Sequence, residues 1–334
     1  MPTPCHLAIT MGDPAGIGPE IIVKAAARLR DRLEAGTLRL LAIGSNGALE
    51  AARATFAPNL PIPEVSEADA AWPALAALQA GPEGEPILPG RLCADGGRFA
   101  YLAVERGVRL AQSGRVGGIV TAPLNKEALN LAGYHYPGHT EMLAELTGAT
   151  GSCMMLAHGN MRVSHVTTHI ALEDVPRRAT PERLRRVIEL THEALARLGT
   201  GRARIAVAAL NPHAGEGGRF GDEEERIIAP AIARLRAEGV DATGPHPADA
   251  LFTPRARQRY DVAVCMYHDQ ALIPLKALDF DEGVNVTLGL PIVRTSPDHG
   301  TAFDIAGRGV ADPGAMAAAI RMAGQIAERR ALSA

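Results

Sequence analysis

Short apolar runs alternate along the chain with longer segments in which apolar positions recur every three or four residues. The short runs are typical of buried strands and the longer segments of amphipathic helices. The expected strands are residues 7–11, 38–43, 118–121, 162–167, 205–210 and 262–266. The expected helices are residues 19–30, 46–56, 99–112, 181–198, 223–238 and 312–330. This alternation predicts an α/β fold in which helices flank a sheet.

The chain has 334 residues, more than a single hydrophobic core usually organises, so we expect two lobes with a cleft between them. Proline and glycine are densest between residues 58 and 97, where both periodicities fade. We therefore expect loop, arm or edge structure in that stretch.

Composition narrows the class of protein. Hydrophobic residues make up 47% of the chain and charged residues 21%, which is enough apolar material for a substantial core. The net charge is -3 and the basic residues are dispersed, so neither nucleic acid nor an anionic membrane is an expected partner. The four cysteines are far apart, which fits a reducing compartment better than disulfides. With no signal-peptide pattern and no long apolar span, we expect a cytoplasmic protein.

A glycine-rich loop follows the first expected strand, with the sequence GDPAGIGPE at residues 12–20. Glycines let a backbone approach a ligand, and a helix N-terminus favours anions. The loop is not G-x-G-x-x-G, however, and a tight strand-to-helix turn with Pro19 as a helix-starting residue explains it equally well.

Three histidines stand within or just after strand-like runs, where sites of α/β proteins assemble: His169, His213 and His268. They are too far apart in sequence to form a local metal motif, and a lone histidine is more often a structural residue than a ligand. If they converge, three imidazoles would hold a divalent cation and leave positions open for a substrate oxygen.

Other polar residues stand in suggestive contexts. Asp269 could orient the imidazole of His268, act as a base or stabilise a turn. Lys276 follows apolar residues, which suggests a partly desolvated amine that meets an anion. Arg294 offers a planar fork for a carboxylate or phosphate, and the alternative is an ordinary surface arginine. His139 and Thr140 start an expected helix at 140–146, where Thr140 is a good N-cap residue.

Several motifs occur together and in order. They are residues 12–20, 138–141 (GHTE), 211–215 (NPHAG), 267–270 (YHDQ) and 283–289 (GVNVTLG). Together they resemble the 4-hydroxythreonine-4-phosphate dehydrogenase family over essentially the whole chain. The stretch HGTAFDIAG at 299–307 also resembles the cofactor loop of isocitrate and isopropylmalate dehydrogenases, whose two-lobed α/β/α fold is then expected.

The resemblance implies a role for each matching position. His169, His213 and His268 match the metal ligands, with His268 expected from the partner subunit of a homodimer. The substrate contacts would be His139, Thr140, Lys276, Asn285 and Arg294. The cofactor contacts would be Gly12, Asp13, His299, Gly300, Thr301 and Asp304, and the catalytic residues Lys276, Asp249 and Asp269. Residues 1–125 and 275–334 would form the cofactor-side lobe, and residues 126–274 the metal- and dimer-forming lobe.

The implied reaction is the oxidation of 4-phosphooxy-L-threonine to 2-amino-3-oxo-4-phosphooxybutanoate, which loses CO₂ to give 3-amino-2-oxopropyl phosphate for pyridoxal phosphate synthesis. NAD, in preference to NADP, and one divalent ion (Zn, Mg, Co or Mn) would be required. Residues 167–172 and 302–305 look closer to a catabolic branch that oxidises 4-phospho-D-threonate or 4-phospho-D-erythronate. A three-histidine metallohydrolase is the alternative from another enzyme class.

Overall fold

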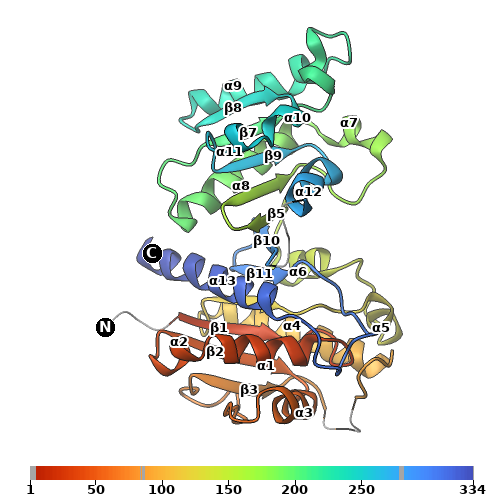
Figure 1. The fold of residues 1–334 in the computed structure, drawn as a ribbon, viewed down its shortest axis with the longest axis vertical. Coiled ribbons are helices and arrows are strands. Elements are labelled where there is room, and N and C mark those ends of the chain that lie inside the picture. Colours follow the sequence, from red (N-terminus) through yellow and green to blue (C-terminus); the bar gives the residue numbers. More distant parts are fainter. Residues whose placement is uncertain (1–4, 83, 85–86, 278–281, 334) are drawn as a thin grey trace. The chain divides into compact units, whose positions relative to one another are not determined.

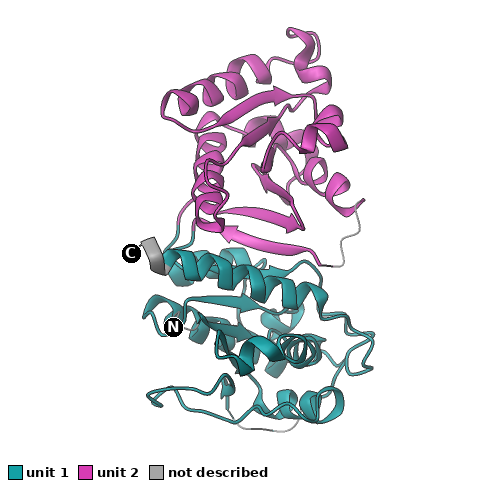
Figure 2. Cartoon of the chain, turned by 60° about the vertical axis from the view of Figure 1, so that its left-hand side comes forward, with its two compact units in different colours: residues 1–149, 290–334 teal, residues 150–289 magenta. Residues whose placement is uncertain are grey.

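The computed structural model describes residues 5–82, 84, 87–277 and 282–333. The chain folds into two compact units, coloured separately in Figure 2. Unit 1 comprises residues 1–149 and 290–334, and unit 2 comprises residues 150–289. These divisions fall later in the chain than the lobe boundaries expected after residues 125 and 274. The first is later because the helix that carries Met142 and Leu143 packs into the core of unit 1. The second is later because residues 284–288 pair with a strand of unit 2.

Unit 1 contains a parallel sheet in the order β3-β2-β1-β4-β11, which Figure 1 shows with its helices. The strands are β1 (Cys5–Thr10), β2 (Leu38–Gly44), β3 (Leu75–Gln79), β4 (Gly118–Thr121) and β11 (Arg294–Pro297). The helices are α1 (Gly18–Arg28), α2 (Arg30–Glu34), α3 (Asn46–Phe56), α4 (Ala94–Gln112), α5 (Lys126–Leu131), α6 (His139–Thr147) and α13 (Gly314–Ser333).

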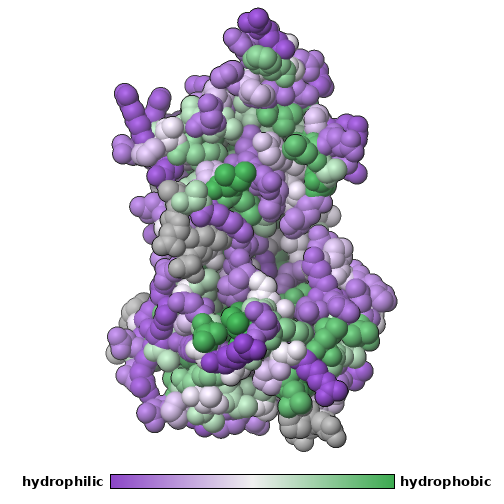
Figure 3. All heavy atoms as spheres, turned by 45° about the vertical axis from the view of Figure 1, so that its right-hand side comes forward, coloured by the Kyte–Doolittle hydropathy of each residue, from purple (hydrophilic) through white to green (hydrophobic). Residues whose placement is uncertain are grey.

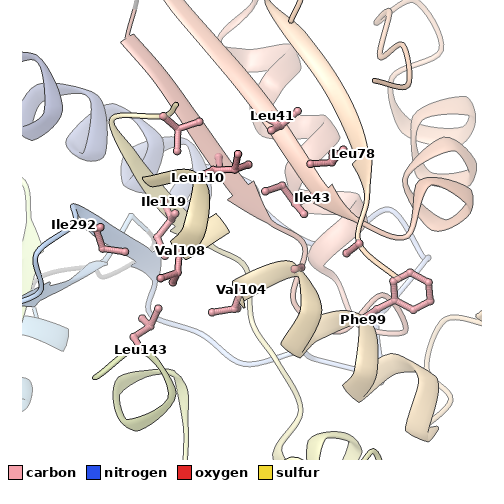
Figure 4. Packing of buried hydrophobic residues seen from close by; sticks show 14 of the residues in the cluster. Leu41, Ile43, Leu78, Phe99, Val104, Val108, Leu110, Ile119, Leu143 and Ile292 are labelled. Atoms are coloured by element: carbon pink, nitrogen blue, oxygen red, sulfur yellow. The ribbon is translucent and has the colours of Figure 1, made fainter. Parts of the chain in front are cut away.

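One part of the core of unit 1 forms between the sheet and α4. Ile43 of β2 and Ile119 of β4 lie among Val104 and Val108 of α4, as Figure 4 shows. Leu143 of α6 joins the same cluster. The positions on α4 are spaced as one helical face, so its periodic apolar stripe is the part that the sheet buries.

Unit 2 contains a mixed sheet in the order β10-β5-β6-β9-β7-β8. The strands are β5 (Cys153–His158), β6 (Met161–His165), β7 (Ile205–Ala208), β8 (Ala242–His246), β9 (Val262–Cys265) and β10 (Val284–Leu288). The pairs β10·β5 and β5·β6 are antiparallel, whereas β6, β9, β7 and β8 pair in parallel.

The helical segments of unit 2 connect these strands. They are η1 (Leu172–Asp174), α7 (Val175–Arg178), α8 (Pro181–Leu198), η2 (Pro212–Glu216), η3 (Glu224–Ile228), α9 (Ala229–Ala237), α10 (Ala248–Leu251), α11 (Pro254–Arg257) and α12 (His268–Lys276). Thr180 caps α8 by accepting the backbone N–H of Arg183. Gly199 then ends the helix in the left-handed conformation, so α8 has clear start and stop signals.

The predicted α/β class is confirmed. In residues 58–97, part of which lies outside the described residues, the structure has the edge strand β3, paired in parallel with β2, which fits the expected edge structure. No helix in the described part of the chain is long and apolar enough to cross a membrane.

Candidate active site

The three candidate metal-binding histidines follow three neighbouring parallel strands. His169 follows β6, His268 follows β9 and His213 follows β7, and β9 pairs with both of the others. Because parallel strands end at the same edge of a sheet, this order brings all three segments to one edge of unit 2. The sequence placed each histidine correctly after a strand but did not reveal that the strands are adjacent.

Two buried polar residues bind these strand ends together. Thr167 donates from its hydroxyl to the carbonyl of Met266 at 2.7 Å, joining the segments after β6 and β9. Gln270 accepts the N–H of Met266 at 2.7 Å and donates to the carbonyl of Ala209 at 2.6 Å, joining the segments after β9 and β7. Sequence reasoning missed both residues, although a buried Gln in the YHDQ motif is the signal that could have identified one.

His169 and His268 approach each other within one chain. Their ring centroids are 5.5 Å apart, a separation that allows two imidazoles to share a cation. Asp269 Oδ1 lies 2.7 Å from Nδ1 of His268. That contact leaves Nε2 of His268 as the ligating atom, as carboxylate partners of metal-binding histidines commonly do.

The donor set fits a divalent cation only in part. Imidazole nitrogens suit a borderline ion such as Zn²⁺ or Co²⁺. Among the residues that the structure describes, however, no three His, Cys, Asp or Glu side chains of one chain form a group that could hold a metal ion. The pair of His169 and His268 therefore needs at least one further protein ligand.

His213 lies on an unusual turn. Its φ is 52°, and Ala214, Gly215, Glu216 and Gly217 also have positive φ values. A left-handed backbone conformation costs about 1–2 kcal/mol for each residue other than glycine, so surrounding contacts must hold this turn in place. The His213 side chain is exposed, and its ring lies 6.3 Å from that of Phe220.

The remaining candidates in unit 2 lie on different elements. Asn285 of β10 donates to the Met154 sulfur at 3.2 Å, and its buried Oδ1 has no partner among the described residues. Asp249 is exposed on α10. The expectation of a partly desolvated Lys276 is wrong for the single chain, because Lys276 is exposed at the last residue of α12, where the helix reaches the surface.

In unit 1, Arg294 is held in a buried position at the start of β11. It is 4% exposed, and its Nε and Nη2 atoms donate to the hydroxyl of Thr121 at 3.2 and 2.7 Å. Burial lowers the pKa of Arg294 to about 10, which leaves it charged at neutral pH. The interpretation of Arg294 as an ordinary surface residue is therefore excluded.

His139 completes this cluster. Burial, and then the positive charge of Arg294, hold the pKa of His139 well below its usual value, so the imidazole is neutral. Its buried Nε2 has no partner among the described residues. Because the imidazole of His139 is neutral, it does not repel the Arg294 guanidinium. Both side chains can therefore donate to one anionic group.

The N-cap interpretation of Thr140 is wrong. Helix α6 starts at His139 with Gly138 as its N-cap, and no side chain caps it. Because the helix begins one residue earlier than expected, Thr140 lies inside the first turn and is exposed. Its hydroxyl is not used for capping.

The glycine-rich loop is buried from residue 11 to residue 20. A side chain at Gly12 would meet the carbonyl oxygen of Pro123 at 2.0 Å, and one at Gly16 would meet that of Thr301 at 2.9 Å. Ile17 donates its N–H to the same Thr301 carbonyl. The glycines thus permit close backbone packing within the protein, and Pro19 lies in the first turn of α1 as expected.

Asp13 is the exceptional side chain of this loop. It is completely buried, Oδ1 accepts the N–H of Ala15 at 2.9 Å, and Oδ2 has no partner among the described residues. Burial raises its pKa to about 6, against a smaller opposing effect of the Ala15 N–H. A carboxyl group so perturbed in a loop at a strand end is typical of functional sites.

The segment expected to bind the cofactor lies over this loop. Thr301 contacts the loop through its backbone, whereas His299, Gly300 and Asp304 are exposed. Glu20 and Lys24 of α1 bind the backbone just after this segment. Glu20 accepts the N–H of Ala311, and Lys24 donates to the carbonyl of Gly309. The cofactor contacts themselves stay predictions.

Comparison with known proteins gives the chain a family. The model of the family described as "Pyridoxal phosphate biosynthetic protein PdxA" matches residues 37–323. A protein of Bradyrhizobium diazoefficiens, provisionally named a D-threonate 4-phosphate dehydrogenase, is 61% identical over 96% of both chains. The 4-hydroxythreonine-4-phosphate dehydrogenase of Erythrobacter litoralis is 50% identical over 97% of both.

Comparison with a solved structure supports the same family. The crystal structure of a 4-hydroxythreonine-4-phosphate dehydrogenase from Burkholderia phymatum has a TM-score of 0.84 at 45% identity, covering 97% of this chain and 98% of the other. The match spans both units, and the relatives are dehydrogenases. The chain therefore belongs to the PdxA family of pyridoxal phosphate biosynthetic proteins.

Proposed function

We propose that the protein is an NAD-dependent, divalent-metal-dependent dehydrogenase that oxidises the C3 hydroxyl of D-threonate 4-phosphate. The observation that carries the proposal is the His169 and His268 pair, at 5.5 Å, on the ends of adjacent parallel strands in a chain of this dehydrogenase family. Oxidation at C3 of this acid gives a β-keto acid. Loss of CO₂ from that product leaves dihydroxyacetone phosphate.

The choice of substrate differs from the one that the sequence favoured. The relative at 61% identity carries the D-threonate 4-phosphate name, whereas relatives named for 4-hydroxythreonine 4-phosphate reach 50%. The catabolic character of residues 167–172 supports the same choice, since that segment contains His169. 4-Phosphooxy-L-threonine is the second candidate, because it shares the phosphate, the carboxylate and the oxidisable hydroxyl.

We assign the binding of the substrate's polar and anionic groups to five side chains. Arg294 and the neutral His139 would donate to one anionic group, together with the hydroxyl of Thr140. Lys276 and Asn285 would contact the other polar groups of the substrate. These contacts would fix the position of the C3 hydroxyl and would be shared by both candidate substrates.

The cation would be held by His169, His213 and His268, with Asp269 orienting His268. When bound, the cation supplies Lewis acidity at the oxidised hydroxyl and NAD supplies the hydride acceptor. Asp249 and Lys276 are the ionisable side chains that we assign to proton transfer at that hydroxyl. The proposed cofactor contacts are Gly12, Asp13, His299, Gly300, Thr301 and Asp304.

A second copy of the chain would complete the metal site. Each candidate ligand is accompanied by an exposed apolar side chain: Ile170 follows His169, Phe220 lies beside His213, and Ile273 is on the helix that His268 starts. Figure 3 shows that apolar patches interrupt an otherwise mostly hydrophilic face. Apolar side chains around an incomplete ligand set are what a homodimer with a shared site would bury.

The resemblance assigns the partner's contribution to His268, whereas the chain itself places His268 beside His169. Subunit mixing tests the shared site in either arrangement. His213→Ala and His268→Ala should each be inactive alone, and a mixed dimer should regain one intact site. No recovery after verified subunit exchange would show that His213 and His268 of each site come from the same chain.

Substrate choice is tested by measuring kcat/KM with NAD for D-threonate 4-phosphate and 4-phosphooxy-L-threonine under identical conditions. We expect D-threonate 4-phosphate to be preferred by at least about tenfold, equivalent to about 1.4 kcal/mol in transition-state binding. The product separates the candidates as well, being dihydroxyacetone phosphate in one case and 3-amino-2-oxopropyl phosphate in the other. The reverse preference would assign the second candidate.

A further inference from the structure

The turn that carries His213 is bound to a single buried carboxylate. Glu224, 3% exposed, accepts the backbone N–H groups of Leu210 and Asn211 on Oε1, both at 2.8 Å. Its Oε2 accepts from the side-chain amide of Asn211 at 3.0 Å. Three donors from the strand end just before His213 therefore converge on one side chain.

The carboxylate of Glu224 also packs against the turn after His213, at Gly215. A side chain at Gly215 would place its Cβ 2.8 Å from Glu224 Oε2, so the turn packs directly against the carboxylate. Asn211 donates to Glu223 as well, at 2.7 Å. Glu224 thus contacts the residues before and after His213.

The backbone on both sides of this contact is irregular. His213, Ala214 and Glu216 have φ values of 52°, 54° and 44°, which residues other than glycine rarely adopt. Glu224 itself begins the π-helical segment η3, and such segments often occur at functional sites. Backbone strain of this kind persists only where the surrounding contacts hold the strained conformation in place.

We propose that Glu224 is a positioning residue for the metal ligand His213: its carboxylate holds the left-handed turn in the conformation that presents the imidazole. This inference rests on the proposed metal-dependent function and extends it to a residue outside the proposed metal and substrate contacts. The three donors fix the chain before His213, and the packing of Gly215 fixes the chain after it.

The first test compares Glu224→Gln with Glu225→Gln, in which the neighbouring exposed glutamate is changed in the same way. Gln keeps the size of Glu224 but turns one acceptor into a donor, which cannot accept from Asn211. Affinity for Zn²⁺ or Co²⁺, measured by competition with a chelator, should fall at least tenfold in Glu224→Gln and stay unchanged in Glu225→Gln. Equal affinities in the two variants would overturn the proposal.

A double-mutant cycle separates positioning from a general loss of stability. In a His213→Ala background, Glu224→Gln should cause no further loss of metal affinity, because the ligand that it positions is already gone. An additional loss of similar size in that background would show that Glu224 does not act through His213. If the wild-type protein binds no cation, the proposed metal function fails as well, so the two failures are distinguishable.

Two further measurements are hydrogen exchange in the metal-free protein and the rescue of metal affinity by a second substitution. The amides of Leu210 and Asn211 should exchange hydrogen faster in Glu224→Gln than in the wild type. Ala214→Gly, which relieves strain at a positive φ, should restore part of the metal affinity lost in Glu224→Gln. Unchanged exchange together with no rescue would contradict the positioning role, even if the variant binds metal weakly.

Discussion

Asp269 Oδ1 lies 2.7 Å from Nδ1 of the neighbouring His268, so the chain fixes which imidazole nitrogen of His268 is available to a cation. Asp269→Asn removes the charge that favours this orientation. We expect metal affinity to fall about tenfold, the lower end of the range for such partners, because Asp269 is exposed to solvent. The exposed Asp31 of α2 is the matched control, and an equal loss in Asp31→Asn would contradict the assignment.

The hydroxyl of Thr121 should be required to hold Arg294. Thr121→Val keeps the shape of the side chain but leaves two guanidinium donors without this acceptor, which costs about 1–3 kcal/mol in the free energy of unfolding. Thr121→Ser should retain most of the stability and a substrate KM close to that of the wild type. Urea unfolding and steady-state kinetics measure both, and a stable Thr121→Val with an unchanged KM would rule out the positioning of Arg294.

Asp13 should make stability depend on pH. Its pKa of about 6 in the folded protein lies above its ordinary value of 3.8, because burial disfavours the charged carboxylate. The proton is therefore bound more tightly in the folded state. The stability that Asp13 contributes is fully present below pH 3.8 and is lost as the pH rises through about 6, by at most roughly 3 kcal/mol.

Asp13→Asn tests this pH dependence. Asn keeps an acceptor for the N–H of Ala15 but carries no charge, so the variant should gain Tm relative to the wild type at pH 8 and not at pH 4. The difference in Tm between variant and wild type isolates Asp13 from other titrating groups. A difference that is the same at both pH values would be inconsistent with a buried, titrating carboxyl group.

Much of the fold could be predicted from periodicity. Helices α3 and α8 begin and end where the sequence placed them, because both have an N-cap residue and a continuous apolar face. Strand β3 was expected only as one of three kinds of structure, loop, arm or edge, because its apolar run lies within proline- and glycine-rich sequence and is defined by pairing with β2. Long-range pairing of this kind leaves little trace in local sequence.

The candidate site was only partly accessible from the sequence. The positions of His169, His213 and His268 after strands could be predicted, since an apolar run that ends in a polar residue marks a strand end. The bonds of Gln270 and Glu224 could not, because each depends on a partner from another segment of the chain. Thr140 showed the opposite error: its residue type favours capping, but Gly138 occupies the N-cap position.

The most direct test of the central claim is the formation of NADH by chelator-treated protein. With NAD and D-threonate 4-phosphate, the metal-free protein should produce no NADH, and adding Zn²⁺, Co²⁺, Mn²⁺ or Mg²⁺ should start turnover that His169→Ala abolishes. Release of CO₂ and dihydroxyacetone phosphate should accompany it. Turnover that persists in excess chelator, or no NADH from either phosphorylated acid with any of these ions, would contradict a metal-dependent dehydrogenase built on His169, His213 and His268.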